Sequence, residues 1–401
     1  MSRSVNPASR ILTRVSQAEL TRRWGAVHRI MRDRGIDAIV MQNTNDWLGG
    51  YVKWFTDLPA NNGYPRTVVF HADAPMSVVE MGPSGNRVSF TPDESLHRGV
   101  GEMLHTPSFT SIGYTDHDDV RLAIDSLRRH PNSTIGLITP GVLPSAFLAA
   151  LREQFSKSTF LDVTADIDAA KAIKSAEEIA LIRRTARLQD DVFAEVISKI
   201  RPGLRDIDVT SIAQCKGQML GSEQGIFLGG SSPLGIRSPF VPRYMQGRTL
   251  EKGDHLSLLI EINGPGGFYT EIARTIVLGK ATAELTDAFA AVKAAQDYSL
   301  SLMKPGVSVR DIFAAHNVYM KQNGMPQETR LYAHGQGYDM VERPLIRQDD
   351  DMELRQGMCL AVHPGYETPS LFAVICDNYM IEENGASECL HRTDKKIFEI
   401  D

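Results

Sequence analysis

Two glutamates interrupt apolar segments that the sequence predicts to be neighbouring strands. Glu261 lies at the end of the apolar run 256–262, and Glu271 lies in the segment 267–278. Alternate side chains of a strand share a face, so Glu271 lies beside Tyr269, a candidate substrate-binding residue. A buried carboxylate is costly unless a cation, a proton or hydrogen-bond donors accompany it. The alternative is a pair of glutamates on a solvent-exposed strand face.

Two histidines and a cysteine–aspartate pair could work with these glutamates. His334 lies in an Ala-His-Gly-Gln-Gly run, where the glycines allow the backbone to approach a ligand closely. His363 precedes a Pro-Gly turn, and Cys376 and Asp377 interrupt another apolar strand. These side chains could supply a general base, a nucleophile or metal ligands. Each could also be structural, since a cysteine in a strand is commonly a small buried hydrophobe.

Arginines in a loop-rich segment are candidates for binding a substrate carboxylate. Residues 222–249 contain many glycines and prolines and few periodic apolar residues, so we expect loops there. The segment contains Arg237 and Arg243, whose planar guanidinium groups can bind a carboxylate through two hydrogen bonds. Surface or dimer-contact roles are the alternative for both.

The first part of the chain predicts an α/β layer. A capping-box pattern at residues 16–19 precedes a helix. Predicted strands alternate with helices beyond it, and we place the strands at 37–41, 67–70, 76–80, 134–138 and 159–163, and the helices at 118–129 and 145–155.

The second part predicts a different, α+β layer. A second capping-box pattern, Ser175 with Glu178, precedes a long amphipathic helix. The predicted elements that follow are a helix at 206–219, the hairpin of the two glutamates, helices at 285–303 and 309–323, and strands near 358–363, 374–381 and 388–390. We therefore expect two domains, residues 1–168 and 169–401.

Composition narrows the class of protein. The 401 residues carry a formal net charge of −6, which gives no basic surface for nucleic acid. No apolar run approaches the roughly 20 residues of a membrane helix, and residues 1–6 lack the apolar core of a secretory signal. The four cysteines show no paired spacing, which is typical of reduced thiols. We expect a cytoplasmic protein with a small-molecule substrate, no nucleic acid and no membrane.

Taken in order, these motifs resemble the pita-bread fold family of creatinase, prolidase, aminopeptidase P and methionine aminopeptidase. The matching motifs are Ile173-Lys174-Ser175, Lys252-Gly253-Asp254, the segment 267–275, Lys304-Pro305-Gly306, His334-Gly335-Gln336-Gly337, His363-Pro364-Gly365 and Glu383-Asn384-Gly385. The resemblance implies an α/β N-terminal domain of the creatinase type followed by an α+β pita-bread catalytic domain. It also implies a homodimer in which the aromatic run 51–55, with Trp54, walls the partner's site. Core packing is the alternative for Trp54.

The resemblance also implies where metal ligands would lie. The metallopeptidases of this family bind two divalent ions through Asp, Asp, His, Glu and Glu, and the matching positions here are Glu261, Glu271, His334, His363 and Cys376. Two close dications need bridging carboxylates, and one of these has become a thiol. The sequence therefore favours a metal-free site, with no cofactor. A single divalent ion held by the two glutamates and the two histidines is the alternative.

Further departures concern peptide cleavage. The peptidases have a substrate-contacting His-Glu pair, and the corresponding run here is Val341-Glu342-Arg343-Pro344, which lacks the histidine and leaves Glu342 and Arg343 as candidate substrate-binding residues. The catalytic histidine of creatinase has no counterpart in 222–253. The sequence thus predicts a hydrolase that acts on a C–N bond of a small non-peptide or amino-acid-derived substrate. His363 or His334 would act as the base, and Cys376 as nucleophile is less favoured. The alternatives are a single-metal Xaa-Pro-type peptidase, a lyase, or a binding protein without catalysis.

Overall fold

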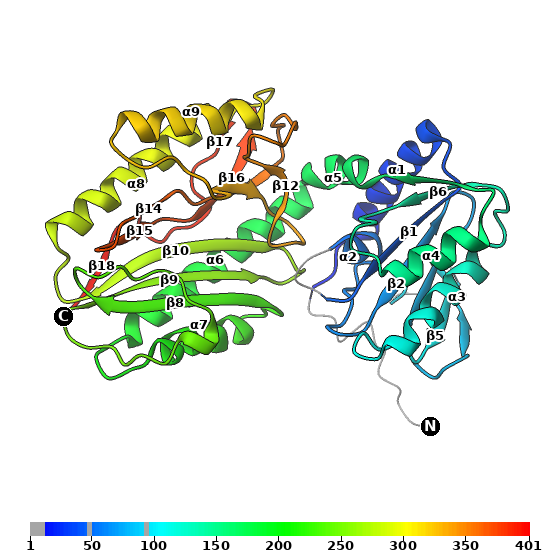
Figure 1. The fold of residues 1–401 in the computed structure, drawn as a ribbon, viewed down its shortest axis with the longest axis horizontal. Coiled ribbons are helices and arrows are strands. Elements are labelled where there is room, and N and C mark those ends of the chain that lie inside the picture. Colours follow the sequence, from blue (N-terminus) through cyan, green and yellow to red (C-terminus); the bar gives the residue numbers. More distant parts are fainter. Residues whose placement is uncertain (1–12, 46–49, 92–95) are drawn as a thin grey trace. The chain divides into compact units, whose positions relative to one another are not determined.

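The computed structural model describes residues 13–45, 50–91 and 96–401, so residues 1–6, where we found no secretory signal, lie outside it. The chain divides into two compact units, residues 1–171 and residues 172–401 (Figure 1). No helix in the described ranges is both long and apolar enough to cross a membrane.

Unit 1 is built on a seven-stranded mixed sheet with the order β4-β5-β3-β2-β1-β6-β7. Its strands are β1 Ala38–Asn43, β2 Arg66–His71, β3 Met76–Met81, β4 Arg87–Ser89, β5 Val100–Thr106, β6 Thr134–Leu137 and β7 Thr159–Asp162. Its helices are α1 Gln17–Arg34, α2 Tyr51–Thr56, η2 Gly113–Thr115, α3 Asp116–Leu127, α4 Ser145–Gln154 and α5 Thr164–Ala172. Apolar side chains of α3 and α4 pack on β1 and β6, which forms the α/β layer that the sequence predicts.

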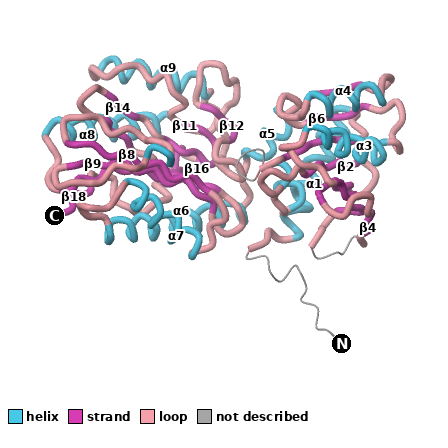
Figure 2. Tube along the Cα trace, turned by 60° about the horizontal axis from the view of Figure 1, so that its bottom comes forward, coloured by secondary structure: helices cyan, strands magenta, loops and turns pink. Residues whose placement is uncertain are grey.

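Unit 2 contains a four-stranded sheet, β18-β10-β9-β8, and a five-stranded sheet, β12-β11-β13-β16-β17. The strands are β8 Gly225–Pro233, β9 Asp254–Asn263, β10 Tyr269–Leu278, β11 Ala333–Gly335, β12 Glu342–Leu345, β13 Cys359–Val362, β14 Gly365–Glu367, β15 Phe372–Val374, β16 Asp377–Glu382, β17 Gly385–Ala386 and β18 Phe398–Ile400. The helices are α6 Ala176–Lys199, α7 Asp206–Met219, η3 Arg243–Met245, α8 Ala283–Leu302 and α9 Val309–Gln322. Figure 2 shows the strands of this unit gathered between its helices.

The first helix of unit 2 begins where its capping residues predict. The hydroxyl of Ser175 accepts a hydrogen bond from the backbone N–H of Glu178, and the Glu178 carboxylate accepts one from the N–H of Ser175. These bonds satisfy two backbone donors that the first turn leaves unpaired. The predicted capping box is therefore confirmed.

The strand pair β9–β10 has two differently used faces. Leu256, Leu258 and Ile260 of β9 pack with Ile272 of β10 against α6 and α7. The opposite face carries a second apolar cluster that includes side chains of β13, β15 and the residue before β16. Because side chains alternate along a strand, the two glutamates lie on this second face, between the two sheets.

Two expectations for unit 2 are wrong. Part of the segment expected to be loops forms strand β8, which pairs with β9 along its length. The glycines of β8 interrupt the alternating pattern that would have predicted a strand. Packing requires a glycine at position 230, since a Cβ on Gly230 would lie 2.1 Å from the carbonyl oxygen of Pro239. Conversely, residues 388–390 are not a strand, and the C-terminal strand is β18, which pairs with β10.

Unit 1 contains a buried histidine that should make it sensitive to acid. The ring of His71 is 1% exposed, and its nitrogens contact Ser77, Ser126 and His130. Burial, followed by the charge of His130, lowers the pKa of His71 to about 4. In the unfolded chain, the side chain of this histidine binds a proton at about pH 6.5. The stability that neutral His71 confers on the folded state is therefore present at neutral pH and is lost as pH falls from about 6.5 to about 4.

We expect acidification from pH 7 to pH 4.5 to lower the free energy of unfolding of unit 1 by about 2–3 kcal/mol through this histidine. All three tryptophans lie in residues 1–171, so urea titrations followed by tryptophan fluorescence report on unit 1. His71→Gln should flatten this pH dependence, whereas the control His117→Gln, at an exposed position of α3, should not. Equal pH dependence in wild type and His71→Gln would contradict the prediction.

Candidate active site

The two glutamates of the hairpin are direct neighbours. β9 and β10 are antiparallel, and their register places Glu271 opposite Glu261. Their exposed fractions are 5% and 6%, so both carboxyl groups are buried inside unit 2. The exposed-face alternative is therefore excluded, and the pair needs compensating partners.

Two amide side chains connect the glutamates. The Nε2 of Gln336 donates to Oε1 of Glu261 at 2.7 Å, and the Oε1 of Gln336 accepts from Nδ2 of Asn378 at 2.7 Å. The Oδ1 of Asn378 in turn accepts from the backbone N–H of Glu271 at 2.7 Å. The sequence analysis did not identify Gln336 and Asn378 as site residues. Their closeness to His334 and Cys376 in the sequence was the available signal.

The second sheet brings both histidines to the same place. β11 contains His334 and pairs with β13, and His363 directly follows the last residue of β13. The two rings meet edge to face with centroids 5.1 Å apart, and His334 Nε2 lies 3.7 Å from Glu271 Oε2. Glu271, His334 and His363 each offer one potential ligand atom, and these three atoms lie within 4.8 Å of one another. We call these three residues the Glu-His-His cluster.

Burial controls the protonation of this region. It raises the pKa of Glu271 to about 7, and burial together with the negative charge of Glu271 raises the pKa of Glu261 well above its usual value. Burial lowers the pKa of His334 to about 4 and the pKa of His363 well below its usual value. Both imidazoles are therefore neutral at physiological pH, which is the form that binds metal ions.

The cysteine lies beside the cluster but is not suited to nucleophilic attack. The thiol of Cys376 donates to the backbone carbonyl of Glu271 at a sulfur–oxygen distance of 3.7 Å. Burial and then the negative charge of Glu271 raise the pKa of Cys376 well above its usual value. Since the thiolate is the reactive form, this environment disfavours the nucleophile alternative.

The neighbouring aspartate is committed to a different interaction. The carboxylate of Asp377 pairs with Arg274 at 2.6 Å, and both side chains are completely buried. The ring of His391 also approaches Asp377, with its Nδ1 3.5 Å from the same aspartate oxygen. Asp377 therefore joins β16 to β10 and does not add to the Glu-His-His cluster.

The expected substrate-binding residues of unit 2 lie in several different elements. Arg237 pairs with Glu367 on the surface, and Arg243 in η3 donates to Gln214. Trp54 is buried in unit 1, Tyr269 is completely buried at the start of β10, Glu342 pairs with Lys174, and Arg343 pairs with Asp350 and Asp351. None of these pairings brings a further charged group to the cluster, and the substrate-binding roles of these residues stay predictions.

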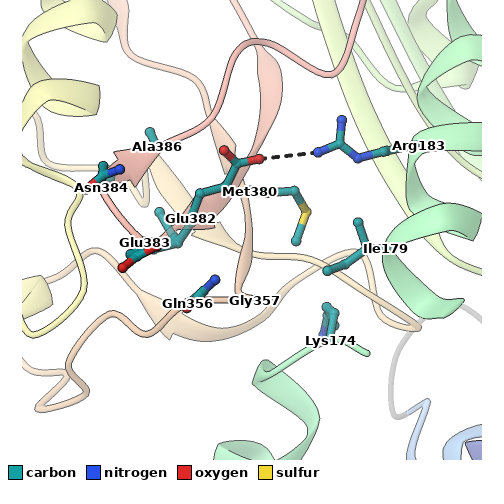
Figure 3. Close-up of a pocket in the computed structure, with 12 residues that line it drawn as sticks. Lys174, Ile179, Arg183, Gln356, Gly357, Met380, Glu382, Glu383, Asn384 and Ala386 are labelled. Atoms are coloured by element: carbon teal, nitrogen blue, oxygen red, sulfur yellow. Dashed lines mark hydrogen bonds and ion pairs between the residues drawn. The ribbon is translucent and has the colours of Figure 1, made fainter. Parts of the chain in front are cut away.

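A hollow of about 680 Å³ lies near the start of α6 (Figure 3). Its lining includes Lys174 and Arg183 together with residues around the β16–β17 turn, and an ion pair joins Arg183 to Glu382. Its lining includes no member of the Glu-His-His cluster. The hollow is therefore separate from the candidate active site.

Buried carboxylates facing two neutral imidazoles across a pair of sheets are typical of hydrolytic centres that bind a metal ion. The profile of Metallopeptidase family M24 matches residues 180–383. The chain belongs to this family. The match confirms the resemblance seen in the sequence and the predicted class of protein, an M24 hydrolase.

Named relatives agree with this assignment. An Xaa-Pro dipeptidase of Pyrococcus furiosus is 26% identical over 267 residues, which cover 66% of this chain and 75% of that protein. A relative from Pyrococcus horikoshii, also called Xaa-Pro dipeptidase, is 26% identical over 258 residues, which cover 64% of this chain and 72% of that one.

Solved structures share the fold of both units. The X-Pro aminopeptidase of Thermotoga maritima superposes with a TM-score of 0.77 at 15% identity, covering 94% of this chain and 99% of that one. The prolidase of Pyrococcus horikoshii gives a TM-score of 0.71 at 19% identity, with 93% and 98% covered. The predicted fold class, a creatinase-type α/β domain before a pita-bread domain, is confirmed.

Proposed function

We propose that this protein is a hydrolase that uses one divalent metal ion to cleave a C–N bond in a small peptide of dipeptide size. The observation that carries the proposal is the Glu-His-His cluster in an M24 chain. The sequence favoured a metal-free enzyme with a non-peptide substrate. The names of the relatives support the peptidase alternative instead.

The residues of the cluster fit a single ion. The Nδ1 of His334 lies 2.9 Å from the carbonyl oxygen of Gly335, which can only accept a hydrogen bond. Nδ1 therefore carries the hydrogen, and Nε2, which lies near Glu271, keeps a free lone pair. Metal-binding histidines characteristically donate their other ring N–H to such an acceptor. Two imidazoles and one carboxylate are also a known ligand set of catalytic zinc.

The same residues do not fit the two-ion centre of the family. One oxygen of Glu261 is already held by Gln336, and the protonated thiol of Cys376 donates to the backbone of Glu271. A thiol has no oxygen that could bridge two ions, and Glu261 is not among the residues whose potential ligand atoms lie within 4.8 Å of one another. We therefore assign Glu271, His334 and His363 as the ligands of one ion.

Each residue then has a distinct task. A bound ion would supply Lewis acidity to polarise the substrate carbonyl and would lower the pKa of water. Glu261 lies across the strands from Glu271, and within the described residues its Oε2 has no hydrogen-bond partner. We assign to Glu261 the transfer of a proton from the attacking water to the departing nitrogen. Gln336 fixes the orientation of this carboxyl group through its other oxygen.

Metal stoichiometry tests the proposal directly. After dialysis against zinc, manganese, cobalt or ferrous ions, elemental analysis should find one ion per chain for at least one metal. Glu271→Gln should weaken binding of that metal by about 100-fold, because one of three ligands is lost. The control Cys376→Ser should leave it unchanged.

A ligand-restoring variant separates one ion from two. His363→Glu combined with Cys376→Glu supplies the carboxylates of the family pattern and should raise the stoichiometry to two. The metal-loaded wild type should also hydrolyse alanyl-proline. Absence of metal binding, two ions in the wild type, or no hydrolysis of any dipeptide would contradict the proposed function.

The assembly and location expected from the sequence also stay proposals. We propose a homodimer in the cytoplasm, supported by the resemblance to the creatinase and prolidase branch. Light scattering should give twice the 44.3 kDa mass of one chain.

A further inference from the structure

Two buried amide side chains of the five-stranded sheet lie between the glutamates of the hairpin. Asn378 lies in β16, and Gln336 directly follows β11. Both residues are completely buried inside unit 2. A buried amide is costly unless its oxygen and its nitrogen both find partners, so the partners of these two side chains decide how each amide is oriented.

The direction of the hydrogen bonds is fixed at both ends. The backbone N–H of Glu271 can only donate, so it is the oxygen of Asn378 that faces it, at 2.7 Å. The Nδ2 of Asn378 then faces Gln336 and donates to its Oε1 at 2.7 Å. At the other end, the carbonyl oxygen of Met340 can only accept, and it receives Nε2 of Gln336 at 3.0 Å. Both ends therefore require the same orientation of the two amides.

The same nitrogen of Gln336 holds one oxygen of Glu261. Nε2 donates to Oε1 of Glu261 at 2.7 Å. When a carboxyl group binds a proton, one oxygen becomes a donor and the other stays an acceptor, and the N–H of Gln336 requires the acceptor at Oε1. A proton taken up by Glu261 is therefore held on Oε2.

The backbone that carries the two amides is also held in place. The N–H of Gln336 donates to the carbonyl oxygen of Cys359 at 3.0 Å. Asn378 pairs with Ala361 in the register of β13 and β16, and its carbonyl oxygen accepts from the N–H of Leu390 at 3.0 Å. Groups that are ordered before the reaction need no further ordering in the transition state.

We propose that Asn378 is a positioning residue that acts on Glu261 through Gln336. The inference rests on the proposed function, in which Glu261 transfers the proton. Asn378 decides which end of the Gln336 amide faces Glu261, and this amide decides which carboxyl oxygen is free to exchange a proton. A reversed amide would place its oxygen against Oε1 of Glu261, where two acceptors would face each other.

Hydrolysis of alanyl-proline by the metal-loaded full chain tests this role. Gln336→Met removes the donor to Glu261 and should lower kcat by about 100-fold, the cost of misplacing a reacting group. Asn378→Leu removes the group that orients Gln336 and should lower kcat by about 10-fold. KM should change by less than about 3-fold in both variants, because the lost interaction acts on the transition state.

The double variant shows whether Asn378 acts through Gln336. Once Gln336→Met has removed the donor, Asn378→Leu should cause no further loss, so the double variant should have the kcat of Gln336→Met. Residues that contribute independently give losses that add. Additive losses, or an unchanged kcat in Asn378→Leu, would overturn the positioning role.

A second variant at the same position covers the case in which Asn378→Leu does not fold. Asn378→Thr suits a strand, and its hydroxyl is too short to join the backbone of Glu271 to Gln336. It should lower kcat by about 10-fold in the wild-type background and leave it unchanged in the Gln336→Met background. A loss in both backgrounds would contradict the role of Asn378.

Asn317→Leu is the matched control. Asn317 also accepts a hydrogen bond from the backbone N–H of a glutamate, Glu328, at 2.6 Å, and it donates to the carbonyl oxygen of the same residue at 3.2 Å. Glu328 is not part of the Glu-His-His cluster. Loss of this amide should therefore leave kcat unchanged, and a loss as large as that of Asn378→Leu would overturn the inference.

Metal content and circular dichroism of the same samples separate positioning from loss of structure. Every variant should keep one ion per chain and the spectrum of wild type, because the Glu-His-His cluster is unchanged. A lower kcat that is accompanied by loss of the ion would overturn the positioning role. No hydrolysis by wild type would overturn the proposed function, whereas hydrolysis with equal kcat in wild type and the Asn378 variants would overturn this inference alone.

Discussion

Glu261→Gln is expected to lower kcat by about 100- to 10,000-fold at neutral pH, the usual effect of removing a group that transfers a proton in the transition state. Glutamine has nearly the same shape as glutamate and can still accept the hydrogen bond from Gln336 Nε2. It cannot take up a proton from water. The fold and the ligands of the ion should therefore be preserved.

Metal content measured on the same samples makes this result decisive. Glu261→Gln should keep one ion per chain, whereas Glu271→Gln should lose both the ion and activity. If Glu261→Gln loses the metal as well, Glu261 is a ligand and not a proton-transfer group. If kcat is unchanged, another residue carries the proton.

Breaking the ion pair between Arg274 and Asp377, whose side chains are both fully buried, should have a large effect on the stability of unit 2. Arg274 donates to Asp377 at 2.6 Å and to the backbone carbonyls of Cys376 and Asp394, and its side chain is fully buried. Burial alone would raise the pKa of Asp377, but the charge of Arg274 outweighs this effect and holds the pKa below its usual value. Arg274→Met would leave an ionised, buried carboxylate without its partner, at a cost of about 3–5 kcal/mol.

Urea unfolding followed by far-ultraviolet circular dichroism measures this loss, and the tryptophan signal reports separately on unit 1. We expect the transition of unit 2 to move and that of unit 1 to stay. Arg347→Met, which breaks the exposed pair with Asp349, is the control and should cost less than about 1 kcal/mol. A similarly small change for Arg274→Met would show that the pair contributes little.

The effect of Arg274→Met also bears on the residue that the sequence analysis placed in the site. Asp377 was a catalytic candidate because it follows Cys376 in an apolar strand. Successive strand residues point to opposite faces, so the neighbour of a site residue is directed away from that site. The charge of Asp377 serves the packing of β10 against β16.

Local patterns in the sequence were sufficient for much of the fold. The residues of the capping box at Ser175 and the alternation in β9 and β10 depend on neighbours within a few positions. They predicted where α6 begins and that Glu261 and Glu271 lie on adjacent strands. The glycines of β8 broke this kind of pattern, because the reason for them is a contact with Pro239, beyond the strand itself.

The sequence by itself determined the family motifs, the glutamate pair and the two candidate histidines, since these are residue types at fixed short spacings. Only the tertiary structure decided which groups compensate the buried charges of unit 2. Gln336 meets Glu261 across 75 positions, and Arg274 meets Asp377 across 103. A buried charge is stabilised by whichever partner the fold brings within hydrogen-bond distance, and no spacing along the chain encodes that distance.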